Sequence, residues 1–393
     1  MKKIVSVLLA TVLAIGCLTG CGEKAADSGN NQQASNSGEL VFKIGGSGPL
    51  TGGAAAYGDA VNKGAQIAVD EINAAGGING VKLEWKMEDD EHDAEKGVNA
   101  YNSLKDWGMQ IMMGTVTSAP CIAVEAEASN DNMFLITPSG TAVDCISGSN
   151  AFRLCFSDPA QGTKSAEYIG VNKLATKVAV IYDSSDPYSA GICESFKAEA
   201  SKQGIEVVAS EAFTADSKTD FKVQLQKAKD SGAELLFLPI YYQEASLILS
   251  QANEMGFSPK IFGCDGLDGI LGVENFDVSL AEGVMLLTPF AADAQDELTK
   301  KFVATYAEKF NGEVPMQFAA DAYDAIYAIK AAIEKSGATA DMSASEICDK
   351  MSAAMTEITL TGLTGTITWD ASGEPNKEPK AVVIENGAYK AMQ

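Results

Sequence analysis

From residue 40 onward the chain alternates short apolar runs with longer segments in which apolar residues recur every three or four positions. Short apolar runs are typical of buried strands, and the wider spacing is typical of amphipathic helices. Because strands separated by helices pair in parallel, this alternation predicts an α/β fold. One expected helix face carries Val61, Ala65 and Ile72. The strands expected in the first half lie at 40–46, 81–88, 110–114 and 133–137, with further helices at about 93–106 and 119–130.

The same alternation starts again after residue 176, which indicates a second α/β unit in tandem with the first. A strand at 284–290 precedes two long helical segments, at about 293–311 and 317–335. The runs at 364–370 and 380–389 are expected to be closing strands, with Asn386-Gly387 as a hairpin turn. The other strands expected in this half lie at 177–183, 205–213, 234–240 and 260–263.

The start of the chain has the pattern of an export signal. Lys2 and Lys3 precede an apolar run at 4–18, which is shorter than the roughly 18 to 20 residues of a membrane-spanning helix. An uncleaved anchor is the alternative. Leu18-Thr19-Gly20-Cys21 resembles the bacterial lipobox, in which lipid is attached to the cysteine and the preceding peptide is removed. We therefore expect a lipoprotein signal peptide at 1–20, a lipid on Cys21, a flexible linker at 21–39 and an extracytoplasmic protein anchored to the cell membrane.

The chain carries 29 basic and 53 acidic side chains, a formal net charge of −24, which argues against nucleic acid as a partner. Its single histidine, His92, would have to serve any Ser-His-Asp triad, multi-histidine zinc site or proton shuttle. We therefore expect no catalytic residues, and a secreted enzyme is the disfavoured alternative. His92 lies in the acidic run at 89–95, where we expect a solvated loop residue. That run lacks the Asp-x-Asp-x-Asp-Gly loop of common calcium sites, so no metal or cofactor is expected.

Six cysteines follow the predicted lipidation site, and none of them forms a Cys-x-x-Cys pair. Zinc ribbons and thioredoxin-like chemistry are therefore unsupported. Exported proteins can form disulfides, and a bridge between Cys145 and Cys155 would close a short loop. The sequence leaves open whether these two are bridged or are buried free thiols. The six are Cys121, Cys145, Cys155, Cys193, Cys264 and Cys348.

Three loops follow expected strands at the sheet edge where open parallel sheets bind ligands. The first, at 45–58, is rich in glycine but lacks the G-x-x-x-x-G-K-[ST] motif of a nucleotide site. The loops at 114–120 and 137–141 place serine and threonine hydroxyls and backbone N–H groups at helix starts. Such positions favour an anion, for example a small carboxylate. The simpler interpretation is that these hydroxyls only cap helices.

Several motifs resemble, in order and spacing, the branched-chain amino-acid binding proteins of ABC importers. They are GPLTGGAAAYG at 48–58, GAQIAVDEINAAGGINGVKLEW at 64–85, MMGTVTSAP at 112–120, FLITPSGT at 134–141, FRLCFSDPAQG at 152–162, VAVIYDSSDPYSAG at 178–191, LFLPIYYQEASLILSQANEMG at 236–256 and GCDGLDG at 263–269. The resemblance covers residues 40–393 and implies a type I periplasmic binding protein fold. In that fold two Rossmann-like parallel-sheet lobes are joined by three crossovers, with a ligand cleft between them. The implied lobe 1 is 40–157 plus 289–361, and lobe 2 is 158–288 plus 362–393.

The resemblance also implies roles for individual residues. In the family, a serine and a threonine in two strand-end loops hold the ligand α-carboxylate, and they match Ser118 and Thr141. The backbone at Ser139 and Gly140 lies beside them. A second-lobe carboxylate holds the α-ammonium and matches Asp265, although the family has glutamate there, so a water-mediated contact or a different ligand stays open. The residues that cover the ligand match Tyr57, Tyr188 and Tyr241. Tyr242 and Gln243 are expected at the surface, and contact with the ligand is the alternative for them.

We therefore predict a lipid-anchored solute-binding protein of an ABC importer. It would capture an amino acid as a monomer, with leucine, isoleucine or valine as the expected ligand, and deliver it to a membrane permease. Closure of the lobes on the ligand would do this without a covalent step. One alternative is the same transport role for another small carboxylated solute, such as another amino acid, an aromatic acid or an amide. Another is a ligand-sensing receptor module of the same fold.

Overall fold

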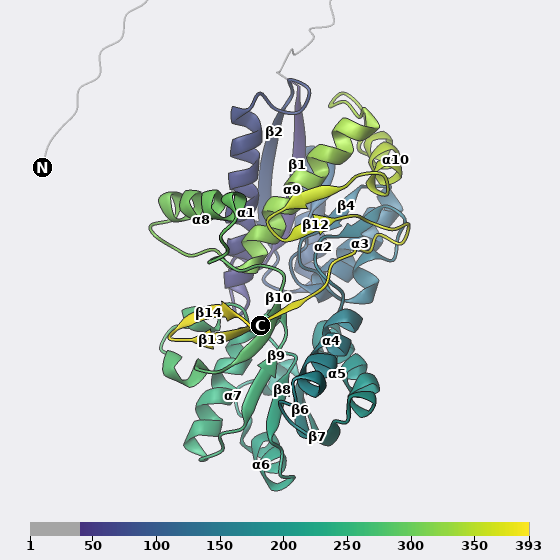
Figure 1. Ribbon diagram of the computed structural model, residues 1–393. Helices are drawn as coiled ribbons and strands as arrows, with labels where there is room; N and C mark the ends of the chain where they lie inside the picture. Colours follow the sequence, from purple (N-terminus) through teal and green to yellow (C-terminus); the bar gives the residue numbers. More distant parts are fainter. Residues whose placement is uncertain (1–39, 393) are drawn as a thin grey trace, which may run out of the picture. The chain divides into compact units, whose positions relative to one another are not determined.

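Five strands form the first sheet of the part of the chain that the structure describes, residues 40–392 of a computed structural model. They are β1 (Val41–Gly48), β2 (Lys82–Asp89), β3 (Ile111–Met113), β4 (Leu135–Thr137) and β5 (Ala151–Arg153). Their order is β2-β1-β3-β4-β5, and every pairing is parallel, as the alternating pattern predicts (Figure 1). The order reverses between β1 and β3, and open parallel sheets bind ligands beside such a switch point.

The predicted signal peptide at 1–20, the lipidation site Cys21 and the linker at 21–39 lie outside the described residues. The chain from Leu40 onward forms one compact unit. None of the helices in this unit is both long enough and apolar enough to cross a membrane.

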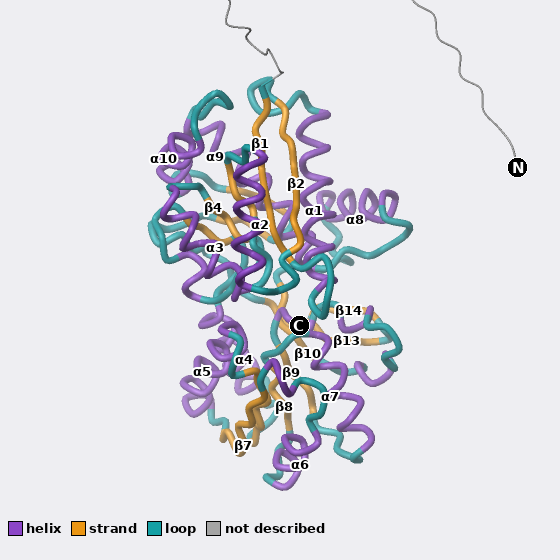
Figure 2. The backbone as a smooth tube through the Cα atoms, turned by 180° about the vertical axis from the view of Figure 1, so that it is seen from behind, coloured by secondary structure: helices purple, strands orange, loops and turns teal. Residues whose placement is uncertain are grey.

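The helices around the first sheet follow the apolar periodicity of the sequence. The predicted face of α1 (Ala55–Ala74), with Val61, Ala65 and Ile72, is buried. That face packs against α9 (Gln317–Ser336), although α1 ends at Ala74, far earlier in the chain. Helices α2 (Ala94–Trp107) and α3 (Ser118–Asp131) lie on the side of the first sheet that faces the viewer in Figure 2. Helices α8 (Glu297–Lys309) and α10 (Ala344–Met355) come before and after α9 in the chain.

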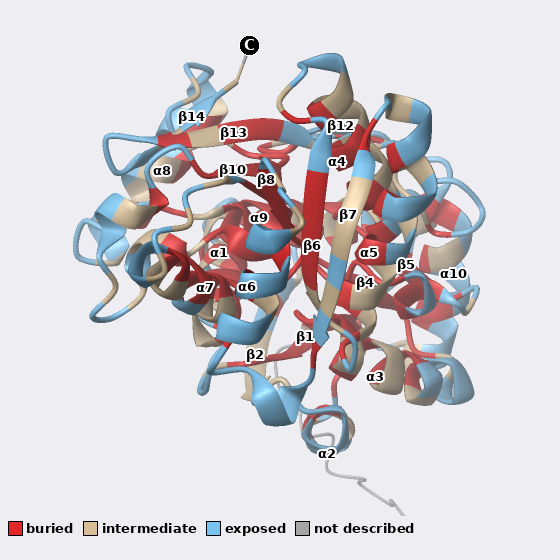
Figure 3. Cartoon of the chain, turned by 90° about the horizontal axis from the view of Figure 1, so that it is seen from below, coloured by how far each residue is buried: buried red, intermediate tan, exposed pale blue. Residues whose placement is uncertain are grey.

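In the same described range, seven strands form the second sheet, in the order β14-β13-β10-β9-β8-β6-β7. The strands are β6 (Lys177–Asp183), β7 (Glu206–Phe213), β8 (Leu235–Leu238), β9 (Lys260–Gly263), β10 (Met285–Thr288), β13 (Lys380–Glu385) and β14 (Ala388–Ala391). The helices are α4 (Asp158–Val171), α5 (Pro187–Ala200), α6 (Lys222–Asp230) and α7 (Tyr242–Glu254). Inner strand β6 is mostly buried, whereas edge strand β7 is more exposed (Figure 3).

Of the two closing strands that the sequence predicts, the one at 380–389 is confirmed as a hairpin, and the one at 364–370 is shorter than predicted. The β13–β14 hairpin turns at Asn386 and Gly387, which both have positive φ, as predicted. The run at 364–370, expected to be one closing strand, contains only the short β12 (Gly365–Ile367), which pairs with β11 (Leu360–Gly362) in a separate sheet. The chain turns there because the carboxylate of Asp324 accepts hydrogen bonds from the two N–H groups just before β12. The predicted lobe boundaries stay a prediction.

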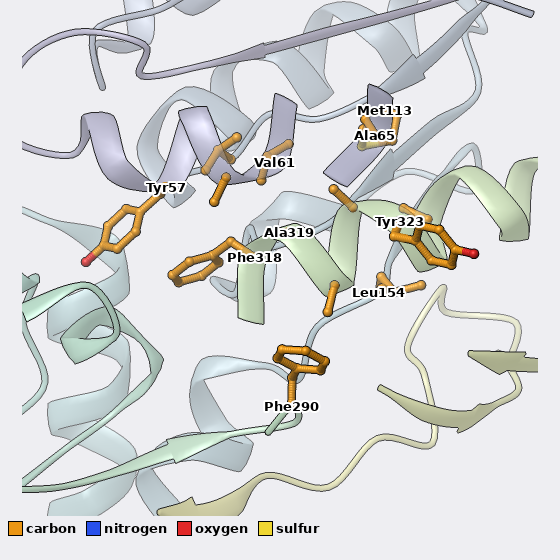
Figure 4. Close-up of a cluster of buried hydrophobic side chains, with 14 of the residues drawn as sticks. Tyr57, Val61, Ala65, Met113, Leu154, Phe290, Phe318, Ala319 and Tyr323 are labelled. Atoms are coloured by element: carbon orange, nitrogen blue, oxygen red, sulfur yellow. The ribbon is translucent and has the colours of Figure 1, made fainter. Parts of the chain in front are cut away.

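Helices α1 and α9 approach each other closely at Gly64. Figure 4 shows side chains of both helices in their shared core, among them Val61 and Ala65 of α1 and Phe318 and Ala319 of α9. A Cβ atom on Gly64 would lie 2.0 Å from the Ala319 carbonyl oxygen, which belongs to a buried helix backbone. We expect Gly64→Ala to lower the free energy of unfolding by about 1–3 kcal/mol in urea denaturation, although alanine favours helices. Gly272→Ala is the control, because Gly272 is exposed and its Cβ position is open. Equal effects of the two substitutions would contradict the close contact.

Candidate ligand-binding site

Two strand-end loops of the first sheet lie against each other at the predicted carboxylate site. Ser118 begins α3, and its hydroxyl oxygen accepts a 3.2 Å hydrogen bond from the N–H of Ala142. In the loop after β4, the Ser139 hydroxyl donates to the carbonyl of Val116 at 2.7 Å. Ser118, Ser139 and Thr141 are all buried, and within the described part of the chain the Thr141 hydroxyl has no partner at good hydrogen-bond geometry. The two loops therefore form one polar surface with an unused hydroxyl.

The predicted tyrosines and Asp265 form a second group, in which Tyr57, Tyr188 and Asp265 are buried and Tyr241 is half-buried. The Tyr188 hydroxyl donates to Asp265 Oδ1 at 2.8 Å. Tyr57, on α1 beside the first sheet, donates to the carbonyl of Gly266 at 2.5 Å, so this group contains elements of both sheets. The Tyr241 ring is stacked on Tyr188, with centroids 4.8 Å apart and an interplanar angle of 8°. Its edge-on contact with Tyr57 has a centroid distance of 5.6 Å.

The start of α4 connects these two groups through residues that the sequence analysis does not single out. The Asp158 N–H donates to the carbonyl of Thr141 at 2.9 Å, and the Asp265 N–H donates to Gln161 Oε1 at 3.1 Å. Asp158 Oδ1 and Gln161 Nε2 are themselves buried, and neither has a partner at good hydrogen-bond geometry among residues 40–392, although the nearby Thr141 and Gln161 side chains act to lower the pKa of Asp158 and Asp265 respectively. Leaving such groups unpaired costs about 1–3 kcal/mol each, so the arrangement indicates a place for a polar ligand.

The electrostatics of this region favour a cation. Burial raises the pKa of the Asp265 carboxyl to about 7, and the hydrogen bond from Tyr188 acts in the opposite direction. Burial also raises the pKa of Asp158 well above its usual range, and the charge of Asp265 raises it further. Among the described residues, neither carboxylate forms a salt bridge with a lysine or arginine. A positive ligand group would therefore relieve the cost of burying their charges.

The prediction that His92 is a solvated loop residue is wrong in part, because the residue is half-buried and its ring makes specific contacts. Its Nδ1 lies 2.8 Å from the Thr117 hydroxyl, and its ring meets Tyr241 edge-on at a centroid distance of 5.3 Å. Burial lowers the pKa of the imidazole to about 4, and the charge of Lys218 lowers it further, so His92 is neutral at pH 7. The acidic run turns inward because Glu91 and His92 adopt left-handed φ values of 50° and 61°. The local sequence does not reveal this turn.

His92 also lines a cavity of about 260 Å³ next to Tyr241. The cavity receives side chains from loops of both sheets, among them Ala54, Ala119, Asp186, Ile240 and Glu244. Tyr242, expected at the surface, is instead buried and packs edge-on against Tyr57 at 4.9 Å between centroids. The aromatic group is therefore larger than the family resemblance implies.

The carboxylates of Asp89 and Asp90, next to His92, stabilise backbone turns by accepting hydrogen bonds from nearby N–H groups. Asp89 Oδ1 accepts hydrogen bonds from the Leu50 and Glu91 N–H groups, and Asp90 Oδ1 accepts one from the His92 N–H. Within residues 40–392, no group of histidine, cysteine, aspartate and glutamate side chains is arranged to hold a metal ion.

The cysteines that the sequence leaves ambiguous are free thiols in the structure, and all six are buried. Cys145 Sγ lies 3.7 Å from the Ser118 carbonyl oxygen, and Cys155 Sγ lies 3.6 Å from that of Gly140. Burial raises the pKa of both thiols, so they pack behind the carboxylate loops as neutral groups.

Two α/β sheets that contribute loops to one enclosed polar site define a bilobal solute-binding protein. A profile of the family described as periplasmic binding protein matches residues 41–384, and the chain belongs to that family. The predicted family and its type I fold are confirmed. Proteins of this family are non-enzymatic transport components that act outside the cytoplasm, bind small amino-acid ligands and work with ABC permeases.

Named relatives share most of their length with this chain. A Leu/Ile/Val-binding protein homolog from Brucella melitensis is 34% identical over 304 residues, which cover 75% of this chain and 79% of the relative. A leucine-, isoleucine-, valine-, threonine- and alanine-binding protein from Pseudomonas aeruginosa is 30% identical, covering 85% and 87%. Among solved structures, the branched-chain amino acid transporter substrate-binding protein LivJ from Streptococcus pneumoniae, in complex with isoleucine, is 32% identical with a TM-score of 0.81, covering 89% and 98%.

Proposed function

We propose that this chain captures a branched-chain amino acid, leucine, isoleucine or valine, and delivers it to the permease of an ABC importer. The observation that carries this proposal is the buried set of unpaired polar atoms on Thr141, Asp158 and Gln161, which lies between the carboxylate loops and Asp265. A free amino acid carries one group of each charge a few bonds apart. This surface offers partners for both.

In the proposed complex, the Ser118 and Thr141 hydroxyls bind the α-carboxylate, while the predicted backbone N–H groups of Ser139 and Gly140 donate to the Thr137 hydroxyl and hold the loop beside it. Asp265 binds the α-ammonium, with Asp158 as a second carboxylate near it. Charge-assisted hydrogen bonds of this kind are roughly twice as strong as neutral ones, so they select for the zwitterion. Tyr57, Tyr188 and Tyr241 would contact the rest of the ligand with largely apolar ring surfaces.

The cellular part of the proposal rests on the sequence. Lipid on Cys21 would hold the protein at the outer surface of the membrane, and the linker at 21–39 would let a monomer reach its permease. A receptor module of the same fold is the second role compatible with this site.

The ligand charge separates the proposal from its main alternative. An aromatic acid or another carboxylated solute without an ammonium group would occupy the carboxylate loops and leave Asp158 and Asp265 buried and unpaired. Such burial is costly, so the two carboxylates favour an amino acid. Any other amino acid would present the same α-carboxylate and α-ammonium to this site. The choice among ligand side chains therefore depends on the aromatic surfaces and the cavity beside His92.

A thermal-shift panel tests the proposed ligand on the chain that follows the predicted signal peptide. At about 100 times its Kd, leucine, isoleucine or valine should add roughly 2.7 kcal/mol of stability and raise the midpoint by a few degrees. The matched controls are 4-methylpentanoate, which is leucine without its ammonium, and 3-methylbutylamine, which is leucine without its carboxylate. Neither should raise the midpoint appreciably. A shift with 4-methylpentanoate as large as that with leucine would contradict the role of Asp265, and a shift with other amino acids alone would contradict the branched-chain assignment.

A further inference from the structure

The fully buried guanidinium of Arg153, at the end of β5, binds four consecutive carbonyl groups of the loop after β4. Its Nη1 donates to the carbonyl oxygens of Gly140 at 3.2 Å and Thr141 at 2.5 Å. Its Nη2 donates to those of Ala142 at 3.0 Å and Val143 at 3.2 Å. A guanidinium presents its donors in a fixed planar fork, so a single side chain sets the orientation of all these peptides.

That orientation determines which groups of the loop face the proposed ligand. In a planar trans peptide the C=O and N–H groups point in opposite directions. In the peptide between Thr141 and Ala142, the Thr141 carbonyl points toward Arg153, so the Ala142 N–H points to the other side of the loop. There the Ala142 N–H donates to the Ser118 hydroxyl at 3.2 Å. Arg153 thus lies behind the loop and the predicted carboxylate-binding serine lies in front of it.

Arg153 is also where a distant segment of the chain contacts β5. Its N–H donates to the carbonyl of Gly373 at 3.1 Å, and its own carbonyl accepts a 2.7 Å hydrogen bond from the Trp369 indole. Its Nε lies 3.3 Å from the carboxylate of Glu374, a charge contact without hydrogen-bond geometry, and this is the one salt bridge that Arg153 makes within the described residues. Segment 369–374 leads to β13 of the second sheet.

The close approach of this segment depends on glycine. Gly373 has a φ of 82°, and a Cβ atom there would lie 2.3 Å from the carbonyl oxygen of Ala151. The backbone of the segment therefore contacts the strand directly. The side chain of the next residue, Glu374, is 34% exposed. Its charge can therefore be removed without opening a buried cavity.

We propose that Arg153 is a positioning residue for ligand binding and that the charge of Glu374 stabilises the buried guanidinium in this position. Through this pair, segment 369–374 controls how the loop at 140–143 presents its N–H groups and the Thr141 hydroxyl. The consequence for affinity rests on the proposed function, whereas the effect on the loop does not. Segment 369–374 continues into β13 of the second sheet. It therefore connects the loop at 140–143, beside the first sheet, with a strand of the second sheet.

Glu374→Gln tests this pairing because it keeps the size of the side chain and removes its charge. Without ligand, we expect amide hydrogen exchange in the loop at 140–143 to become about tenfold faster, with no change in β1 or β6. With leucine as the probe, we expect calorimetry to show an affinity about tenfold lower at a temperature where both proteins are folded. Arg153→Lys, which keeps the charge but loses the fork, should have the same two effects.

The control is Glu378→Gln, which removes an exposed carboxylate from the same part of the chain. It should change neither the amide exchange at 140–143 nor the leucine affinity. Faster exchange throughout the protein, in parallel with a lower melting temperature, would show a purely structural role and overturn the proposal. Unchanged exchange at 140–143 in both variants would overturn it as well. If the wild-type protein does not bind leucine, the proposed function fails, while the exchange measurement still decides whether Arg153 and Glu374 position the loop.

Discussion

Asp265→Asn is expected to weaken leucine binding by roughly 30- to 4,000-fold, because truncating one partner of a buried charged pair costs about 2–5 kcal/mol. Asparagine keeps the size of the side chain and can still accept the hydrogen bond that Tyr188 donates, so the protein should remain folded. The measurement is isothermal titration calorimetry at pH 8. Asp216→Asn, at an exposed position, is the matched control and should bind leucine normally.

The same residue predicts a pH dependence. Burial raises the pKa of the Asp265 carboxyl in the ligand-free protein to about 7, and the ammonium group binds the ionised form. Leucine affinity should therefore fall as the pH drops below 7, by up to about tenfold per pH unit where one proton must be released. In Asp265→Asn this dependence should be reduced. A pH-independent affinity in the wild-type protein, or stronger binding of 4-methylpentanoate by wild type than by the variant, would contradict the role assigned to Asp265.

The stability of the ligand-free protein should follow the opposite trend over the same range. A carboxyl group whose pKa is raised by folding binds more protons in the folded state, so its contribution to stability is present at low pH and is lost as the pH rises toward 7. Asp186, with a pKa raised by burial to about 7, acts in the same direction. Ligand binding should reduce the part of this trend that comes from Asp265.

The sequence predicts those elements whose residues follow the usual patterns of apolar spacing in helices and of Asn-Gly in tight turns. α1 follows from the spacing of Val61, Ala65 and Ile72, and the β13–β14 turn follows from Asn386-Gly387. Elements that serve the site break those patterns. The inner side of α4 carries Asp158 and Gln161 in place of apolar residues, so its periodicity is weak and the helix escapes prediction. β5 has only three residues, too few to show a period.

The candidate site shows the same division. Ser118, Thr141 and Asp265 were predicted through the family resemblance, and the structure places them in adjoining buried groups, while their roles stay proposals. Asp158 and Gln161 become noticeable only when burial leaves their polar atoms unpaired. The position of His92 depends on a left-handed turn and on Thr117, which lies 25 residues away in the chain. Local composition carries no signal for such a contact.

Lys377→Met is expected to lower the free energy of unfolding by about 3–5 kcal/mol, the usual effect of removing one partner of a buried salt bridge. The Lys377 ammonium lies 2.7 Å from Asp321 Oδ1, and the two side chains are only 3% and 2% exposed. The lysine follows segment 369–374, and Asp321 belongs to α9, so this pair fixes the chain where it passes toward β13. Urea denaturation of both proteins at pH 8 measures the difference.

The size and pH dependence of this loss distinguish a buried pair from an exposed one. Lys309→Met is the control, because Lys309 and Asp70 also lie 2.7 Å apart but are 41% and 43% exposed, and such surface pairs contribute about 0–1 kcal/mol. Burial raises the pKa of Asp321 to about 6 even beside Lys377, which lowers it. Without the lysine the carboxyl should protonate more readily, so the loss should be smaller at pH 5 than at pH 8. Asp321→Asn combined with Lys377→Met should restore part of the stability, because no uncompensated charge then remains buried. Equal losses for Lys377→Met and Lys309→Met would show that the Asp321 charge is solvated in the folded protein.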